Sequence, residues 1–122
     1  MRWDDVVTLA TKWPEVGEAV SYGEPSLKTR KSLLTRHRVG DDSVVLLDVP
    51  TEERDHLIDI MPEVFFVEPH YLGHEIVLAR LAPLPADVLA RILERRWRNS
   101  ASKGAVRAFD GPALAAPPER QD

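Results

Sequence analysis

The chain has 122 residues, 43% of them hydrophobic and 30% charged, which fits one globular domain with a single core. Its formal net charge is −4, which argues against a protein that is basic over its whole surface. Cysteine is absent, which excludes disulfides, thiol nucleophiles and zinc–thiolate sites, and no apolar run is long enough to span a membrane. The first residues lack the basic-then-apolar order of a signal peptide, so we expect a cytoplasmic protein.

Helical spacing of apolar residues near the N-terminus predicts an amphipathic first helix, which Pro14 ends. Asp4 and Asp5 stand in its first turn, where acidic side chains interact favourably with the helix dipole. We expect both tryptophans of this stripe to anchor the core. The apolar positions are Trp3, Val6, Val7, Ala10 and Trp13.

Three strands are predicted next, over residues 26–29, 32–38 and 43–49, after a turn at 22–25. Residues 39–42 form the expected hairpin turn between the last two strands. Residues 44–47 are continuously apolar, which is typical of a central strand covered on both faces. Alternation in the second strand separates two sets of side chains, Leu33, Thr35 and His37 on one side and Leu34, Arg36 and Arg38 on the other.

Two helices and a hairpin are predicted for the second half of the chain. Thr51 is the expected N-cap of a middle helix that Pro62 stops. A hairpin over residues 62–81 follows, and then a last helix over about 86–99. The last helix has an apolar face of Val88, Leu89, Ile92, Leu93 and Trp97, opposite a polar face of Arg91, Glu94, Arg95 and Arg98.

These elements predict an α+β fold with one compact domain over residues 1–107. In this fold an antiparallel sheet is flanked by N-terminal, middle and C-terminal helices. Residues 108–122 lack an apolar period and are rich in Ala, Pro and charge, so we predict a disordered tail there.

The loop of the hairpin at 62–81 is the first candidate binding region. Pro69 lacks an N–H for a strand ladder and Gly73 can take a positive φ, so the chain is expected to turn here. His70, Tyr71 and His74 are then exposed on a rigid hairpin, a usual place for binding groups.

Four stretches of the sequence resemble the MmcQ/YjbR-like family of small bacterial proteins. Pro62–Phe66 and Pro69–Gly73 resemble its Pro-Glu-Val-Phe-Phe and Pro-His-Tyr-x-Gly motifs, and Ser21–Lys28 resembles its Ser-Tyr-Gly-x-Pro-x-Phe-Lys entry motif. Leu93–Arg98 resembles its final helix, with an aromatic residue followed by Arg. The resemblance runs from about Trp3 to Val106 and departs from the pattern at Leu27, where the family usually has an aromatic residue.

The resemblance implies a fold similar to double-wing DNA-binding domains and to frataxin, and a DNA-binding role. Two basic segments, 28–38 and 91–107, are consistent with a phosphate-contacting face that does not read bases strongly. The alternative interpretation is that these are solvated helix and strand faces. The predicted DNA-contacting residues are Lys28, Arg30, Lys31, Arg36, Arg38, Arg91, Arg95 and Arg98.

The second hypothesis is a protein- or small-ligand-binding domain. It would use a surface formed by Tyr22, Lys28, His70, Tyr71 and His74. Glu68, His70, His74 and Glu75 are the residue types that ligate metals, but their spacing across a loop does not make them converge, so no metal site is predicted. No nucleophile elbow and no Gly-rich phosphate loop is present, so we predict a non-catalytic binding module without a cofactor.

Overall fold

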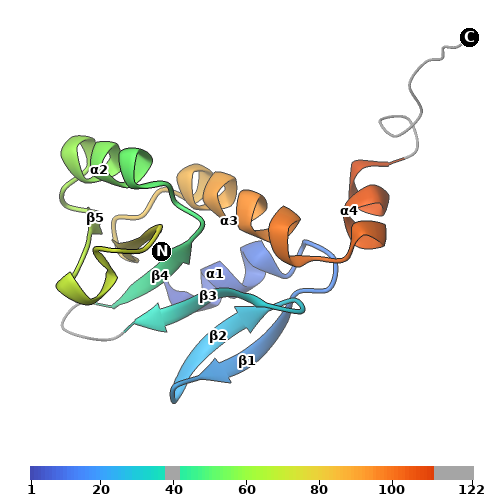
Figure 1. Cartoon of the computed structure of the whole chain (residues 1–122). Helices are drawn as coiled ribbons and strands as arrows, with labels where there is room; N and C mark the ends of the chain where they lie inside the picture. Colours follow the sequence, from blue (N-terminus) through green and yellow to red (C-terminus); the bar gives the residue numbers. More distant parts are fainter. Residues whose placement is uncertain (38–41, 112–122) are drawn as a thin grey trace, which may run out of the picture.

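A six-stranded antiparallel sheet organises the fold, in the strand order β1-β2-β3-β4-β6-β5 (Figure 1). The computed structural model describes residues 1–37 and 42–111. The strands are β1 (Gly17–Ser21), β2 (Glu24–Lys28), β3 (Ser32–His37), β4 (Ser43–Leu47), β5 (Phe65–Phe66) and β6 (Ile76–Arg80). The helices are α1 (Trp3–Ala10), α2 (Thr51–Ile60), the 3-10 helix η1 (Pro69–Tyr71), α3 (Ala86–Ser100) and α4 (Lys103–Asp110). No helix in the described ranges is long and apolar enough to cross a membrane.

One face of the sheet is buried beneath the helices. Leu27, Leu34, Leu46 and Val77 stand in register across β2, β3, β4 and β6, and all four are fully buried. They belong to one core with the apolar stripes of α1, α2 and α3. Trp97 of α3 is also fully buried, and its indole N–H is satisfied because it donates to the carbonyl of Pro14 at 2.8 Å.

The opposite face of the sheet, called here the open face, is not covered by these helices. Its central row is Thr35, Val45, Leu78 and Phe66, in register across β3, β4, β6 and β5. Val45 and Leu78 are buried, although they lie outside the helix-facing core. The segment 67–75, which connects β5 to β6 and contains η1, packs over part of this face. The central position predicted for residues 44–47 is confirmed, since β4 lies between β3 and β6, but only the helix-facing side of the strand is fully covered.

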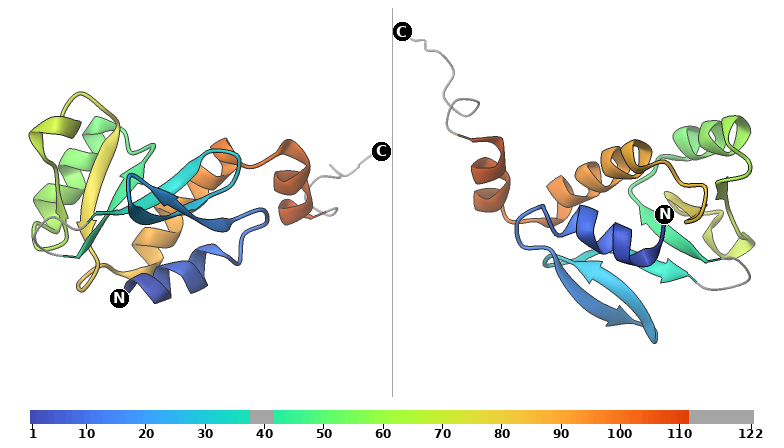
Figure 2. Two further views of the ribbon diagram at one scale, coloured as in Figure 1. Left: turned by 90° about the horizontal axis from the view of Figure 1, so that it is seen from below. Right: turned by 180° about the vertical axis from the view of Figure 1, so that it is seen from behind.

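The β1–β2 hairpin differs from the predicted strand arrangement. The sequence predicts a turn at 22–25 before the first strand, whereas Tyr22 and Gly23 form a two-residue turn between β1 and β2. Both have positive φ, 52° and 80°, as the tight turn of a twisted hairpin requires. The strand β1 was missed because GEAVS has little β propensity, and the hairpin projects from the domain (Figures 1 and 2).

Three further boundaries are corrected by the structure. The N-cap of α2 is Pro50 rather than Thr51, and no side chain caps that helix. The first strand of the hairpin predicted over residues 62–81 is only two residues long, β5, and it pairs with β6 as expected. The predicted tail begins too early, because α4 continues to Asp110 and the ring of Phe109 lies 4.9 Å from that of Trp97. Residues 112–122 of that tail lie outside the described residues.

Two carboxylates attach α4 to the domain, and they make its docking sensitive to acid. Asp110 accepts two hydrogen bonds from Arg98, at 2.8 and 3.1 Å, which lower the pKa of Asp110. Glu15 accepts from the backbone N–H of Ser102 at 3.0 Å and from its hydroxyl at 2.7 Å, and these bonds lower the pKa of Glu15.

We expect α4 to detach at low pH before the rest of the domain unfolds. A carboxylate whose pKa is lowered in the folded state stabilises the docked helix fully at pH values above its unfolded pKa, which is about 4 for Asp and Glu. This stabilisation is lost as the pH falls through the lower, folded-state pKa. The protection factors of residues 103–110 against hydrogen exchange should therefore fall below about pH 4, and Asp110→Asn should already lower them at neutral pH. Unchanged protection of α4 down to pH 3 would contradict this attachment.

Candidate functional site

A cavity of about 670 Å³ lies on the open face of the sheet. Its volume is within the range typical of small-molecule sites. Its floor comes from β3, β4 and β6, and its walls come from the β1–β2 hairpin and from the segment 67–75. The lining residues are Ser21, Tyr22, Glu24, Ser32, Thr35, Arg36, His37, Val45, Leu47, His70, Tyr71 and Ile76.

Strand alternation explains the apolar floor of the cavity. Thr35 pairs with Val45, and Leu47 pairs with Ile76, so these side chains share the face opposite the helices. On the helix side the same strands contribute Leu34 and other core residues. The cavity exists because the open face has no helix above it, and a single loop segment covers it only in part.

The segment 67–75 is held in place by a buried arginine of α2. Arg54 is only 6% exposed, and its Nη1 donates to the carbonyl oxygens of Leu72 and His74, at 3.4 and 3.3 Å. Its Nε also donates to Asp55 at 3.2 Å. The backbone N–H of Val49 donates to the Glu75 carbonyl at 3.0 Å, which fixes the end of the segment next to β6. These contacts position η1, and with it His70 and Tyr71, beside the sheet.

Two polar atoms in the cavity lining are buried without a hydrogen bond. In the described part of the chain four buried side-chain polar atoms lack a partner, and two of them, Glu24 Oε1 and His37 Nε2, belong to residues that line the cavity. His37 Nε2 lies 3.3 Å from Glu68 Oε1, but the two groups are not aligned for a hydrogen bond. Buried polar atoms are normally paired, so these two define where a bound molecule would find partners.

An aromatic cluster forms the wall above His37. The ring of Tyr71 meets that of His37 edge-on at 6.5 Å and that of His70 edge-on at 4.8 Å. Tyr22 stands at the opposite rim, fully exposed, in a left-handed conformation that costs a non-glycine residue free energy. Aromatic side chains therefore occupy both sides of the cavity mouth.

The structure unites part of the predicted ligand-binding surface. Tyr22, His70 and Tyr71 line the cavity together, whereas Lys28 and His74 do not. Lys28 lines a smaller hollow on β1 and β2, and His74 contributes its carbonyl to Arg54. Sequence reasoning missed Glu24, and it assigned no binding role to His37. The alternation of side chains along the strand, which groups Thr35 with His37, was the signal that could have identified His37.

Three of the six predicted DNA-contacting arginines are paired with carboxylates of the same chain. Arg36 donates to Asp42 at 2.9 and 3.0 Å, and these hydrogen bonds raise the pKa of Arg36. Arg95 forms a two-bond ion pair with Glu53, at 2.9 and 3.2 Å, and Arg98 pairs with Glu94 and Asp110. Intramolecular pairing of this kind reduces the positive charge available to phosphates.

The remaining predicted cations are divided between the two sides of the sheet. Lys28 lies with Ser26 on the open face, whereas Arg91 lies on α3, which covers the other face. Arg30 donates to the Ala101 carbonyl at 3.4 Å, so the β2–β3 turn touches the end of α3. No ion pair involves Lys28, Lys31 or Arg91 within residues 1–37 and 42–111. Arg38 lies outside the described residues.

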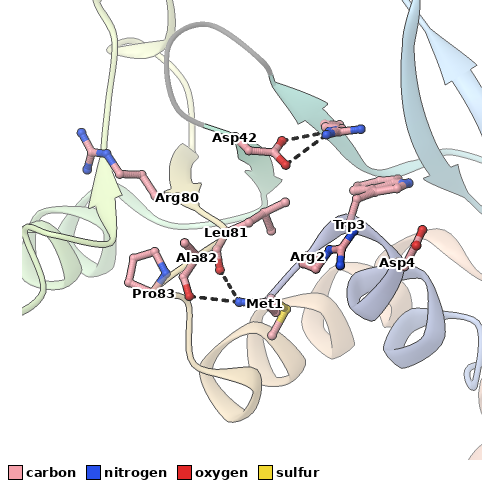
Figure 3. A pocket seen from close by; sticks show the side chains of 10 residues that line it. Met1, Arg2, Trp3, Asp4, Asp42, Arg80, Leu81, Ala82 and Pro83 are labelled. Carbon is pink, nitrogen blue, oxygen red and sulfur yellow. Dashed lines mark hydrogen bonds and ion pairs between the residues drawn. The ribbon is translucent and has the colours of Figure 1, made fainter.

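A second hollow, of about 630 Å³, lies beside the first turn of α1 (Figure 3). Several of its polar groups are already used internally. The amine of Met1 donates to the carbonyls of Leu81 and Ala82, at 2.6 and 3.0 Å, and Asp42 accepts from Arg36. We take the open-face cavity as the candidate site because its lining contains the buried Glu24 and His37 atoms that lack a hydrogen bond.

The loop residues with metal-ligating side chains do not form a metal centre. Across the described residues, no three His, Cys, Asp or Glu side chains are arranged to hold an ion. Glu68 faces His37, and His70 packs on Tyr71.

The fold and the cavity define a small single-domain α+β protein with a six-stranded antiparallel sheet. No family model matches the chain, and no solved structure matches it. The chain is 27% identical over 121 residues to the "Uncharacterized protein Rv2570" of Mycobacterium tuberculosis (strain ATCC 25618 / H37Rv), an alignment that covers 88% of this chain and 94% of that protein. The "Uncharacterized protein Mb2600" of Mycobacterium bovis (strain ATCC BAA-935 / AF2122/97) matches with the same identity and coverage. Membership of the MmcQ/YjbR-like family stays a prediction.

Removing the guanidinium of Arg54 should loosen the segment that forms the cavity wall. We expect Arg54→Met to lower the free energy of unfolding by about 1–3 kcal/mol, because it leaves two carbonyls without their donor. Hydrogen exchange of residues 68–75 should accelerate more than that of β3 and β4. Arg91→Met, at an exposed arginine on α3, is the matched control and should change neither quantity. Equal stability of the two variants in a denaturant titration would contradict the role assigned to Arg54.

Proposed function

We propose that this protein is a non-catalytic binding module that takes a small organic molecule in the open-face cavity. The observation that carries the proposal is the pair of unpartnered buried atoms, Glu24 Oε1 and His37 Nε2, in an otherwise largely apolar concavity. Leaving such atoms unpaired costs free energy, and a ligand that hydrogen-bonds them recovers part of that cost.

The arrangement of the cavity supports a small ligand rather than a flat macromolecular surface. Small-molecule sites combine apolar walls with a few polar groups that fix orientation. Here Val45, Leu47 and Ile76 supply the apolar floor, and Tyr71 supplies an aromatic wall.

DNA binding stays a prediction, and the ion pairs described above reduce its support. Three of the eight predicted cations, Arg36, Arg95 and Arg98, are paired with carboxylates of the same chain.

Fluorescence anisotropy of labelled oligonucleotides at low and near-physiological salt distinguishes the two functions. Phosphate binding weakens steeply with salt, and it would be lost on charge reversal of Arg91 and Arg95.

Filling the cavity should abolish small-molecule binding without unfolding the protein. Thr35 stands on the cavity floor, so Thr35→Phe places a ring in the space a ligand would occupy. We expect fragments that show saturation-transfer NMR signals with the wild type to lose them with this variant. Thr8→Phe makes the same chemical change at an exposed position of α1 and should leave the signals unchanged.

Circular dichroism and thermal melts verify that both variants are folded. If Thr35→Phe is unstable, Tyr71→Ala, which removes a wall rather than filling the floor, replaces it. Fragments that bind the wild type and both cavity variants equally would show that the site lies elsewhere.

A further inference from the structure

We propose that the cavity prefers a ligand with a protonated amine beside a flat apolar ring, an inference that rests on the proposed binding function. The open-face cavity has an excess of carboxylates over available cations, and its floor is apolar. The two features together select for a ring-bearing ammonium compound over a neutral or anionic one.

Glu24 supplies the principal negative charge. Its Oε1 is buried and accepts no hydrogen bond from any described residue, and no ion pair of Glu24 occurs in that part of the chain. Ser26 of β2 pairs with Thr35 of β3 in an antiparallel register. Two residues further along each strand, the same register places Glu24 opposite His37 on the open face. A carboxylate oxygen can only accept, so the complementary ligand group is a hydrogen-bond donor.

Within the described residues no charged group forms an ion pair with Glu24, although the charge of Arg36 acts on it at longer range. Arg36 is the cation in the lining, but its guanidinium is bound through two hydrogen bonds to Asp42. Glu68 adds a second carboxylate, 3.3 Å from His37 Nε2. The titratable side chains around the cavity are therefore Glu24, Glu68, His37, His70, Tyr22 and Tyr71, together with the Arg36–Asp42 pair. A cationic donor would be attracted to this set, and an anion would be repelled.

The apolar floor and the aromatic wall suit a ring attached to that amine. Val45, Leu47 and Ile76 offer branched aliphatic surface, and Tyr71 offers a ring for edge or face contact. An ammonium group near the Tyr71 ring face would gain a further attraction of the cation–π type.

Three compounds of nearly equal size separate charge preference from simple apolar binding. Benzylamine is cationic at neutral pH, benzyl alcohol is neutral and benzoate is anionic. We expect the dissociation constant of the full chain for benzylamine, from ligand-observed NMR titration at pH 7, to be about tenfold lower than that for benzyl alcohol. Benzoate should bind most weakly.

Glu24→Gln tests the assignment of the charge. It should bring benzylamine to within about twofold of benzyl alcohol, while Glu18→Gln, at an exposed acid on β1, leaves the preference intact. The wild type could bind all three compounds equally, and Thr35→Phe could abolish that binding. This result would overturn the charge preference but would still support the binding function. The inference would also be overturned by any of three results: benzoate binds most tightly, none of the three compounds binds, or Glu24→Gln keeps the preference for benzylamine. The binding function itself is judged separately, by the wider fragment collection and the cavity-filling variant.

Discussion

The buried guanidinium of Arg54 is the contact on which the candidate site depends. The sheet has two faces, and the helices bury only one, so the open face would expose Val45 and Leu78 to water unless another segment covered it. The segment 67–75 covers it in part, and Arg54 holds that segment through two backbone carbonyls. A buried arginine is costly unless its donors are satisfied, so the loop conformation and the burial of Arg54 stabilise each other.

A second constraint is the way in which the chain uses its own charges. A net-acidic protein with two basic segments can present a cationic surface, but here carboxylates from distant parts of the sequence meet the arginines. Glu53 reaches Arg95, and Asp48 reaches Arg96 at 3.1 Å. These pairs link α3 to α2 and to the end of β4. Their main consequence is that several arginines of the basic segments stabilise the fold from within, while Glu24 forms no ion pair among the described residues.

The fold class could be predicted from the sequence because helical and strand periodicities are local signals. The stripe of α3, the apolar run of β4 and the hairpin pairing of β5 with β6 all follow from residue spacing. The site was harder to predict, because it depends on which strands become neighbours. His70 and Tyr71 were identified from their loop, but Glu24 and His37 meet them only through the pairing of β2, β3 and β4. Residue spacing also does not predict the ion pair between Arg36 and Asp42, because that pair depends on how β3 and β4 are placed side by side.

Amide chemical-shift mapping of the labelled full chain, titrated with benzylamine, tests the central claim most directly. The account predicts that the largest shifts fall on β2, β3 and β4 around Glu24, Thr35 and Val45, and on residues 69–71. The outer face of α3 should stay unchanged. Largest shifts around Arg91 and Arg95, or beside Met1 and Ala82, would contradict the account, because the molecule would then bind away from the open face.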